Sequence, residues 1–241
     1  MRKLLLIFLH GVATAACFCQ NVQMYYDLRH SVDPTNFKKN FPALSFEYFR
    51  DLDSVGTGSF LFRLDTQLSG EKCNMGQAFA QVSQSLRFWK PKPGLSVYYS
   101  GGLGVVLPGN GFFITNAVGM GSACPFQWRG AWISIGIYFR ASFYARQSYD
   151  PQLILYFGKG FHGYRIFTDG SFVFWTENRN QGSDYTRNLS GKKFAFFGDP
   201  KVWIKISGGL SAGIKTSVFY NLTATGSKLK IYPAIGTRYR F

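Results

Sequence analysis

Few residues of this chain have side chains suited to catalysis, and histidine is the scarcest of them. The chain has three histidines in 241 residues, and only His30 and His162 lie beyond the N-terminal segment. It contains no His-Glu-x-x-His zinc motif. A lipid-modifying enzyme needs an activated serine beside a histidine, and no serine motif accompanies His162. We therefore expect no catalytic residue, no metal site and no cofactor, so that a lipid-modifying enzyme is only a remote alternative.

Charged and aromatic residues that alternate with apolar residues are more informative. In 131–141, isoleucine or phenylalanine occupies positions 133, 135, 137 and 139, and Trp132, Tyr138 and Arg140 lie on the other face. A period of two is typical of a β-strand with one apolar face. We predict that the opposite faces of such strands line a lumen and bind a solute. The candidate lining residues are Tyr25, Asp27, Arg29, Glu47, Arg63, Asp65, Arg87, Tyr98, Trp132, Tyr138, Arg140, Trp203, Lys205, Tyr232 and Arg238.

This lining combines positive charge with aromatic rings. An aromatic side chain that stacks on a nucleic-acid base contributes about 1–3 kcal/mol, and polar side chains recognise hydroxyls and ring nitrogens. The lining therefore suits a small, planar, polar solute. The alternative is that these charges only pair with one another across a narrow, closed lumen.

About twelve segments show the alternating pattern. They cover 22–29, 42–50, 59–68, 77–89, 95–104, 111–121, 131–141, 152–158, 162–176, 194–206, 210–221 and 228–241. The alternation is poor in 111–121, and Pro200 predicts a β-bulge in 194–206 because proline cannot donate to the ladder. Bacterial single-chain barrels have an even number of strands. The sequence thus predicts an all-β fold, a transmembrane antiparallel up-and-down β-barrel of about 12 strands.

The connections between these segments alternate in length. The longest, 177–192, is polar and suits an exposed surface loop, whereas 122–130 and 159–161 are expected to be turns at the periplasmic end, where both termini lie. This arrangement places Cys73 and Cys124 on opposite sides of the membrane, so we expect no disulfide between them. A soluble barrel or sandwich is the alternative fold. The charged and aromatic faces, and the terminal aromatic Phe241, argue against it.

The N-terminus resembles a targeting segment. Arg2 and Lys3 precede an apolar run that begins at Leu4, and small residues follow near a cleavage site. We predict a signal peptide over 1–19, removed to leave a single barrel domain over 20–241. The rival is a lipoprotein acylated at Cys17. A transmembrane helix would need about 20 apolar residues, more than this segment offers.

Composition and charge limit the partners. Aromatic residues make up 18% of the chain, with 25 Phe and 14 Tyr, which favours strands over helices. The net charge of +15 comes from scattered Lys and Arg rather than from a dense basic run, so we expect no nucleic-acid partner. Outer-membrane lipids and the phosphates of lipopolysaccharide are better counterparts, and other envelope proteins are further candidates.

Several stretches resemble one family. They are Asn21 to Asp27, Ser45 to Phe49, Gly58 to Asp65, Gly198 to Trp203 and the ending Tyr232 to Phe241. Together they resemble a family of outer-membrane barrels related to the nucleoside-specific channel-forming (Tsx-like) proteins, and the resemblance covers essentially the whole mature chain. It implies a twelve-stranded monomeric barrel that passes nucleosides. The basic lumen departs from this pattern and leaves room for nucleotides or other anions.

The expected function is therefore an outer-membrane channel of a Gram-negative bacterium for passive uptake of small polar solutes, with nucleosides as one candidate. The alternative is a structural or accessory barrel with a plugged lumen in a larger outer-membrane complex.

Overall fold

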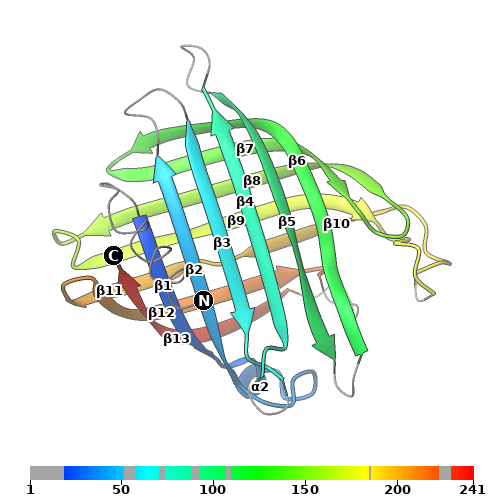
Figure 1. Cartoon of the computed structure of the whole chain (residues 1–241), viewed down its shortest axis with the longest axis horizontal. Helices are drawn as coiled ribbons and strands as arrows, with labels where there is room; N and C mark the ends of the chain where they lie inside the picture. Colours follow the sequence, from blue (N-terminus) through cyan, green and yellow to red (C-terminus); the bar gives the residue numbers. More distant parts are fainter. Residues whose placement is uncertain are drawn as a thin grey trace, which may run out of the picture.

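The chain forms one closed β-barrel (Figure 1). The computed structural model describes residues 19–51, 58–70, 74–87, 93–106, 110–184, 186–222 and 229–241. Its elements are β1 (Cys19–Asp27), α2 (Arg29–Val32), β2 (Phe41–Asp51), β3 (Ser59–Gln67), β4 (Gln77–Leu86), β5 (Gly94–Val106), β6 (Asn110–Trp128), β7 (Ala131–Ser142), β8 (Ser148–Phe161), β9 (Ile166–Asn178), β10 (Lys192–Gly198), β11 (Lys201–Ser207), β12 (Leu210–Tyr220) and β13 (Lys230–Arg240). Each strand runs antiparallel to its neighbours.

The barrel closes where the last strand pairs with the first. β13 pairs with β12 on one side and with β1 on the other, where Val22 faces Tyr239 and Tyr26 faces Ile235. The exposed Phe241 follows this seam, and its backbone N–H donates to the carbonyl of Gln20 at 3.1 Å. β10 and β11 occupy one position between β9 and β12. The barrel therefore has twelve strand positions, and the predicted all-β barrel is confirmed.

The division between β10 and β11 falls at Pro200, but the predicted bulge there is wrong. Gly198 pairs with Phe172 and Lys201 pairs with Asp169. The chain therefore advances by three residues between these pairs both on the β10–β11 strand and on β9. No extra residue is inserted, which a bulge would require. The strand is interrupted only because Pro200 has no N–H to donate, and its carbonyl still accepts from the N–H of Thr216 at 2.9 Å.

The polarity of the barrel is inverted relative to a soluble protein. Ile137, Met120 and Ile204 point outward and are 65%, 57% and 58% exposed. Inward-facing polar residues are buried instead; Gln23 is 1% exposed and Asp199 is fully buried. Because side chains alternate between the two faces of a strand, the sequence pattern predicted this inversion. No helix among the described residues is long and apolar enough to cross a membrane.

The two ends of the barrel differ in their connections. We call the end at which β1 begins and β13 ends the terminal mouth, and the opposite end the loop mouth. The connections at the loop mouth are 28–40, 68–76, 107–109, 143–147, 179–191 and 221–229, and those at the terminal mouth are 52–58, 87–93, 129–130, 162–165 and 208–209. The connections at the terminal mouth are shorter on average, as the sequence predicted.

Two predicted turns are placed wrongly. The stretch 122–130 is not a connection, because β6 continues to Trp128 and only Arg129 and Gly130 turn, with φ of 48° and 74°. Two consecutive residues with positive φ are typical of the tight turn that joins hairpin strands. Likewise β8 extends to Phe161, so that the turn lies at 162–165 rather than 159–161.

The poor alternation of 111–121 has a structural cause. The register between β5 and β6 shifts between Ser100 and Gly102, and the inward face of β6 carries small residues. A Cβ added to Gly119 would lie 2.0 Å from Cε1 of Tyr98, so the glycine makes room for this ring. At Gly119 the ring of Tyr98 from β5 thus fills the space of the missing side chain.

Several predictions concern residues that the structure does not describe. The signal peptide over 1–19 lies outside the described residues except for Cys19, and so does the rival acylation site Cys17. Cys73 also lies outside them. Cys124 lies on β6 near the terminal mouth and has a free thiol.

We predict that Gly119→Ala destabilises the barrel by about 1–3 kcal/mol, because the added methyl group overpacks against Tyr98. The measurement is a urea titration of the folded protein in detergent micelles. Gly158→Ala is the matched control, since a Cβ there would make an ordinary 3.5 Å contact with Cζ of Phe167. Equal losses of stability in both variants would refute this account.

Candidate functional site

The lumen contains two chambers that meet near the middle of the barrel. One opens toward the terminal mouth and has a volume of about 200 Å³. We call it the terminal chamber. The other lies toward the loop mouth, has a volume of about 1350 Å³, and is called the loop chamber. Arg63 and Ser171 line both chambers, so the boundary between the two lies at these residues.

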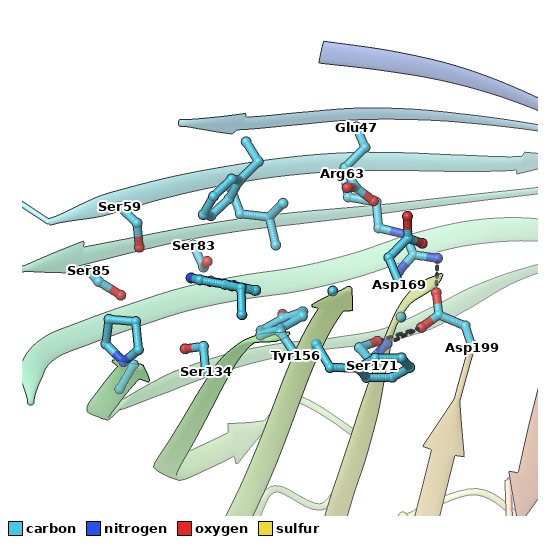
Figure 2. Close-up of a pocket in the computed structure, with 18 of the residues that line it drawn as sticks. Glu47, Ser59, Arg63, Ser83, Ser85, Ser134, Tyr156, Asp169, Ser171 and Asp199 are labelled. Carbon is cyan, nitrogen blue, oxygen red and sulfur yellow. Dashed lines mark hydrogen bonds and ion pairs between the residues drawn. The ribbon is translucent and has the colours of Figure 1, made fainter. Parts of the chain in front are cut away.

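One region of the terminal chamber is a wall of hydroxyl groups (Figure 2). Ser59 of β3, Ser83 of β4 and Ser134 of β7 line it, and their hydroxyls have no hydrogen-bond partner among the described residues. Close by, the hydroxyls of Ser85 and Ser96 lie 2.9 Å apart. A serine hydroxyl both donates and accepts. This wall can therefore bind a solute that carries several donors and acceptors.

The other region of the terminal chamber is charged, and Asp199 is at its centre (Figure 2). This fully buried carboxylate accepts from the Ser171 hydroxyl at 2.6 Å and from the Ser171 backbone N–H at 2.8 Å. Its second oxygen lies 2.7 Å from Nη2 of Arg63. Arg63 also contacts Asp65, with Nε at 2.7 Å from the carboxylate. The ion pair thus links β3 to the β10–β11 strand across the lumen.

Four further residues join Arg63, Asp65 and Asp199 in what we call the central network. Lys201 is 4% exposed, and its Nζ lies 3.7 Å from Asp199 and 3.8 Å from both Asp169 and Glu47. Nη1 of Arg238 donates to Asp169 at 2.6 Å. The central network is therefore Glu47, Arg63, Asp65, Asp169, Asp199, Lys201 and Arg238, contributed by β2, β3, β9, the β10–β11 strand and β13. It separates the two chambers with paired charges.

The loop chamber is wide, basic and aromatic. Its wall includes Trp175, whose indole N–H donates to Glu177 at 3.1 Å, and Arg140, whose guanidinium lies 5.1 Å from the centre of the Trp175 ring. Glu177 is 2% exposed and also accepts from Tyr144 at 3.1 Å. Nζ of Lys193 lies 3.0 Å from the same carboxylate. These contacts fix the aromatic wall close to the loop mouth.

Arg29 holds the connection 28–40 against the loop mouth. Its guanidinium is paired with Asp27 at 3.1 Å and lies 5.5–5.6 Å from the centres of four rings, those of Phe37, Phe41, Phe219 and Tyr232. Asp33 adds a second attachment, because it accepts from Asn36 at 2.8 Å, from Tyr232 at 2.9 Å and from Lys230 at 3.4 Å. These hydrogen bonds, chiefly that from Asn36, hold the pKa of the Asp33 carboxyl below its usual range.

The structure brings most of the predicted lining residues together. Glu47, Arg63, Arg87, Trp132, Tyr138 and Arg238 line the terminal chamber, and Arg29, Arg63, Asp65, Tyr98 and Arg140 line the loop chamber. The others lie elsewhere. Tyr25 and Trp203 pack in a buried cluster, Asp27 and Tyr232 are buried in pairs with Arg29 and Asp33, and Lys205 is exposed near the terminal mouth.

Sequence reasoning missed the residue at the centre of the network. Asp199, Lys201 and Trp203 occupy alternate positions along the strand, so alternation alone predicts that all three point into the lumen. The bulge expected at Pro200 would have turned Asp199 to the opposite face. The serine wall was missed for another reason. An inward serine in a strand pattern looks like a small spacer, and only the fold shows that Ser59, Ser83 and Ser134 line one chamber.

Comparison of the chain with models of protein families finds no match, and comparison with curated proteins finds none. Among the described residues, no group of three or more His, Cys, Asp or Glu side chains could hold a metal ion. The geometry offers hydrogen bonding and stacking in the terminal chamber, and positive charge with aromatic surface in the loop chamber.

We predict that Asp199→Asn destabilises the barrel by roughly 3–5 kcal/mol, because it leaves Arg63 and Lys201 buried without their shared counter-charge. Urea titration in detergent micelles measures the loss. Asp184→Asn is the matched control, since Asp184 pairs with Arg187 at the surface, where both side chains are at least 70% exposed. Such an exposed pair contributes about 0–1 kcal/mol, so a loss of the same size in both variants would contradict a buried central network.

Proposed function

We propose that this chain is an outer-membrane channel for the passive passage of small polar solutes. The observation that supports it best is the pair of chambers arranged in series inside a closed barrel. A solute that enters at the loop mouth meets the wide chamber first, then the central network, and then the terminal chamber. The terminal chamber is smaller than the roughly 300–1,000 Å³ of pockets for drug-sized ligands, which favours small solutes.

The inverted polarity supports insertion in a membrane. A closed barrel leaves no unpaired strand edge, and its backbone hydrogen bonds are satisfied within the sheet, as a lipid environment requires. The outward residues form an apolar surface that a soluble monomer would not expose at this scale. β1 begins and β13 ends at the mouth with the shorter connections, which in bacterial outer-membrane barrels is the periplasmic end.

Nucleosides are the solutes we favour. The serine wall of the terminal chamber offers free hydroxyls to a sugar, and the ring of Trp132, which packs edge-on to Phe49 with centroids 5.6 Å apart, offers a surface to a base. Aromatic stacking accepts any base because every base has a π-face. The resemblance to nucleoside-specific channel-forming proteins points in the same direction.

The central network favours a second candidate. Paired charges span the lumen between the chambers. If they close it, the chain is an accessory barrel that serves a larger envelope complex. Conductance separates the two functions, because a closed barrel folds normally and passes no ions.

We predict that the protein forms small, discrete conductance steps in planar bilayers and that adenosine reduces the current. Trp132→Ala should weaken this block by roughly tenfold, within the about 1–3 kcal/mol expected for one stacked base. Trp128→Ala is the matched control, because Trp128 is 60% exposed and does not line either chamber. A correctly folded barrel without conductance would exclude the channel and support the accessory barrel.

A second prediction tests the membrane-facing surface. Ile137→Arg should reduce the stability of the barrel in lipid vesicles by about 2–4 kcal/mol, the cost of arginine on the lipid face near the bilayer midplane. Val32→Arg is the control, since Val32 is 54% exposed but lies in α2, outside the strands. Urea titration in vesicles gives both values. A soluble barrel would tolerate both substitutions equally.

A further inference from the structure

The inward face of β12 carries a cation, a hydroxyl and an aromatic ring in succession. Lys215, Ser217 and Phe219 alternate with outward residues, and all three line the loop chamber. At about 3.4 Å per residue, roughly 14 Å separates the first from the last along the strand. This strip therefore presents three kinds of contact to one chamber. A small organic molecule can reach all three, because the side chains extend toward it from the strand.

The two donors of the strip have no acceptor among the described residues. No carboxylate among the described residues lies within 4.0 Å of Lys215, whose Nζ is 5.0 Å from the centre of the Tyr25 ring. Its cross-strand neighbour Lys201, in contrast, has three carboxylates within 3.8 Å. Ser217 is 7% exposed, and its hydroxyl has no hydrogen-bond partner in the described part of the chain. A carboxylate or phosphate oxygen would complete this arrangement by accepting from both groups.

The aromatic end of the strip is built by two strands. Phe219 faces Phe197 of β10 across the ladder, and the ring centres lie 5.4 Å apart. Both rings line the loop chamber. They offer an apolar surface to a ring whose charged group lies at Lys215 and Ser217.

The charge of the whole chamber favours the same kind of ligand. Its wall includes six cationic side chains, Arg29, Arg63, Arg140, Arg179, Lys193 and Lys215, and two carboxylates, Asp65 and Glu177. A cavity with such a surplus of one sign concentrates small ions of the opposite sign. Lys215 and Ser217, together with the surplus positive charge of the chamber, therefore all favour an anionic ligand.

We propose that the loop chamber binds small organic anions that carry a ring. The carboxylate or phosphate group contacts Lys215 and Ser217, and the ring packs against Phe197 and Phe219. The proposal rests on the proposed function, since a solute reaches the chamber through the loop mouth, and it extends that function from neutral solutes to anionic ones.

The test is isothermal titration calorimetry of the detergent-solubilised barrel with three probes. 3-Phenylpropionate carries charge and ring, its neutral amide carries the ring alone, and acetate carries the charge alone. We expect 3-phenylpropionate to bind at least tenfold more tightly than either of the others. Lys215→Met should weaken its binding at least tenfold, and Lys215→Arg should retain it. Migration of unheated protein on gels verifies that each variant is folded.

Lys38→Met is the matched control, because Lys38 is an exposed lysine in the connection at the same mouth and does not line the chamber. Equal affinity for 3-phenylpropionate and its amide would overturn the proposal, as would equal binding by Lys215→Met and Lys38→Met. Binding is measured without current, so a barrel that binds 3-phenylpropionate but does not conduct would refute only the channel. A barrel that conducts without binding it would refute only this inference.

Discussion

Closure of the sheet between β1 and β13 is the constraint on which the rest of the structure depends. Once the last strand pairs with the first, every strand has two neighbours, and the backbone needs no partner from solvent. Alternation then assigns each side chain to one of two surfaces. The apolar residues take the outside, so the polar residues must satisfy one another in the lumen. The buried pair of Arg63 and Asp199 is a consequence of that requirement.

Most of the fold could be predicted from the sequence, because alternation is a local signal that each strand repeats. All twelve segments correspond to strand positions, and 10 of the 15 predicted lining residues line a chamber. The pattern fails where a residue's surroundings come from another strand. Gly119 looks like a weak strand position until Tyr98 is seen to fill the space beside it. Ends of strands are also poorly predicted, as Trp128 shows, since only pairing with β7 reveals that β6 continues.

The site was harder to predict than the fold, for the same physical reason. Alternation predicts that a side chain points into the lumen, but it does not predict which other side chains it contacts there. Lys201 and Lys215 are both inward lysines on adjacent strands and look equivalent in sequence. The fold surrounds Lys201 with the carboxylates of Glu47 from β2, Asp169 from β9 and Asp199 from its own strand, and leaves Lys215 facing a wide chamber. Their different surroundings follow from which side chains other strands bring to each position.

The unequal size of the two chambers has an electrical consequence. Wide, water-filled segments conduct well, so in a conducting barrel more of an applied voltage would fall across the small terminal chamber, which Arg63 and Ser171 border, than across the loop chamber. One elementary charge moved through the full potential exchanges about 2.3 kcal/mol per 100 mV. Most of the paired charges of the central network line that smaller chamber, so their arrangement would be more sensitive to membrane voltage than the charges of the loop chamber.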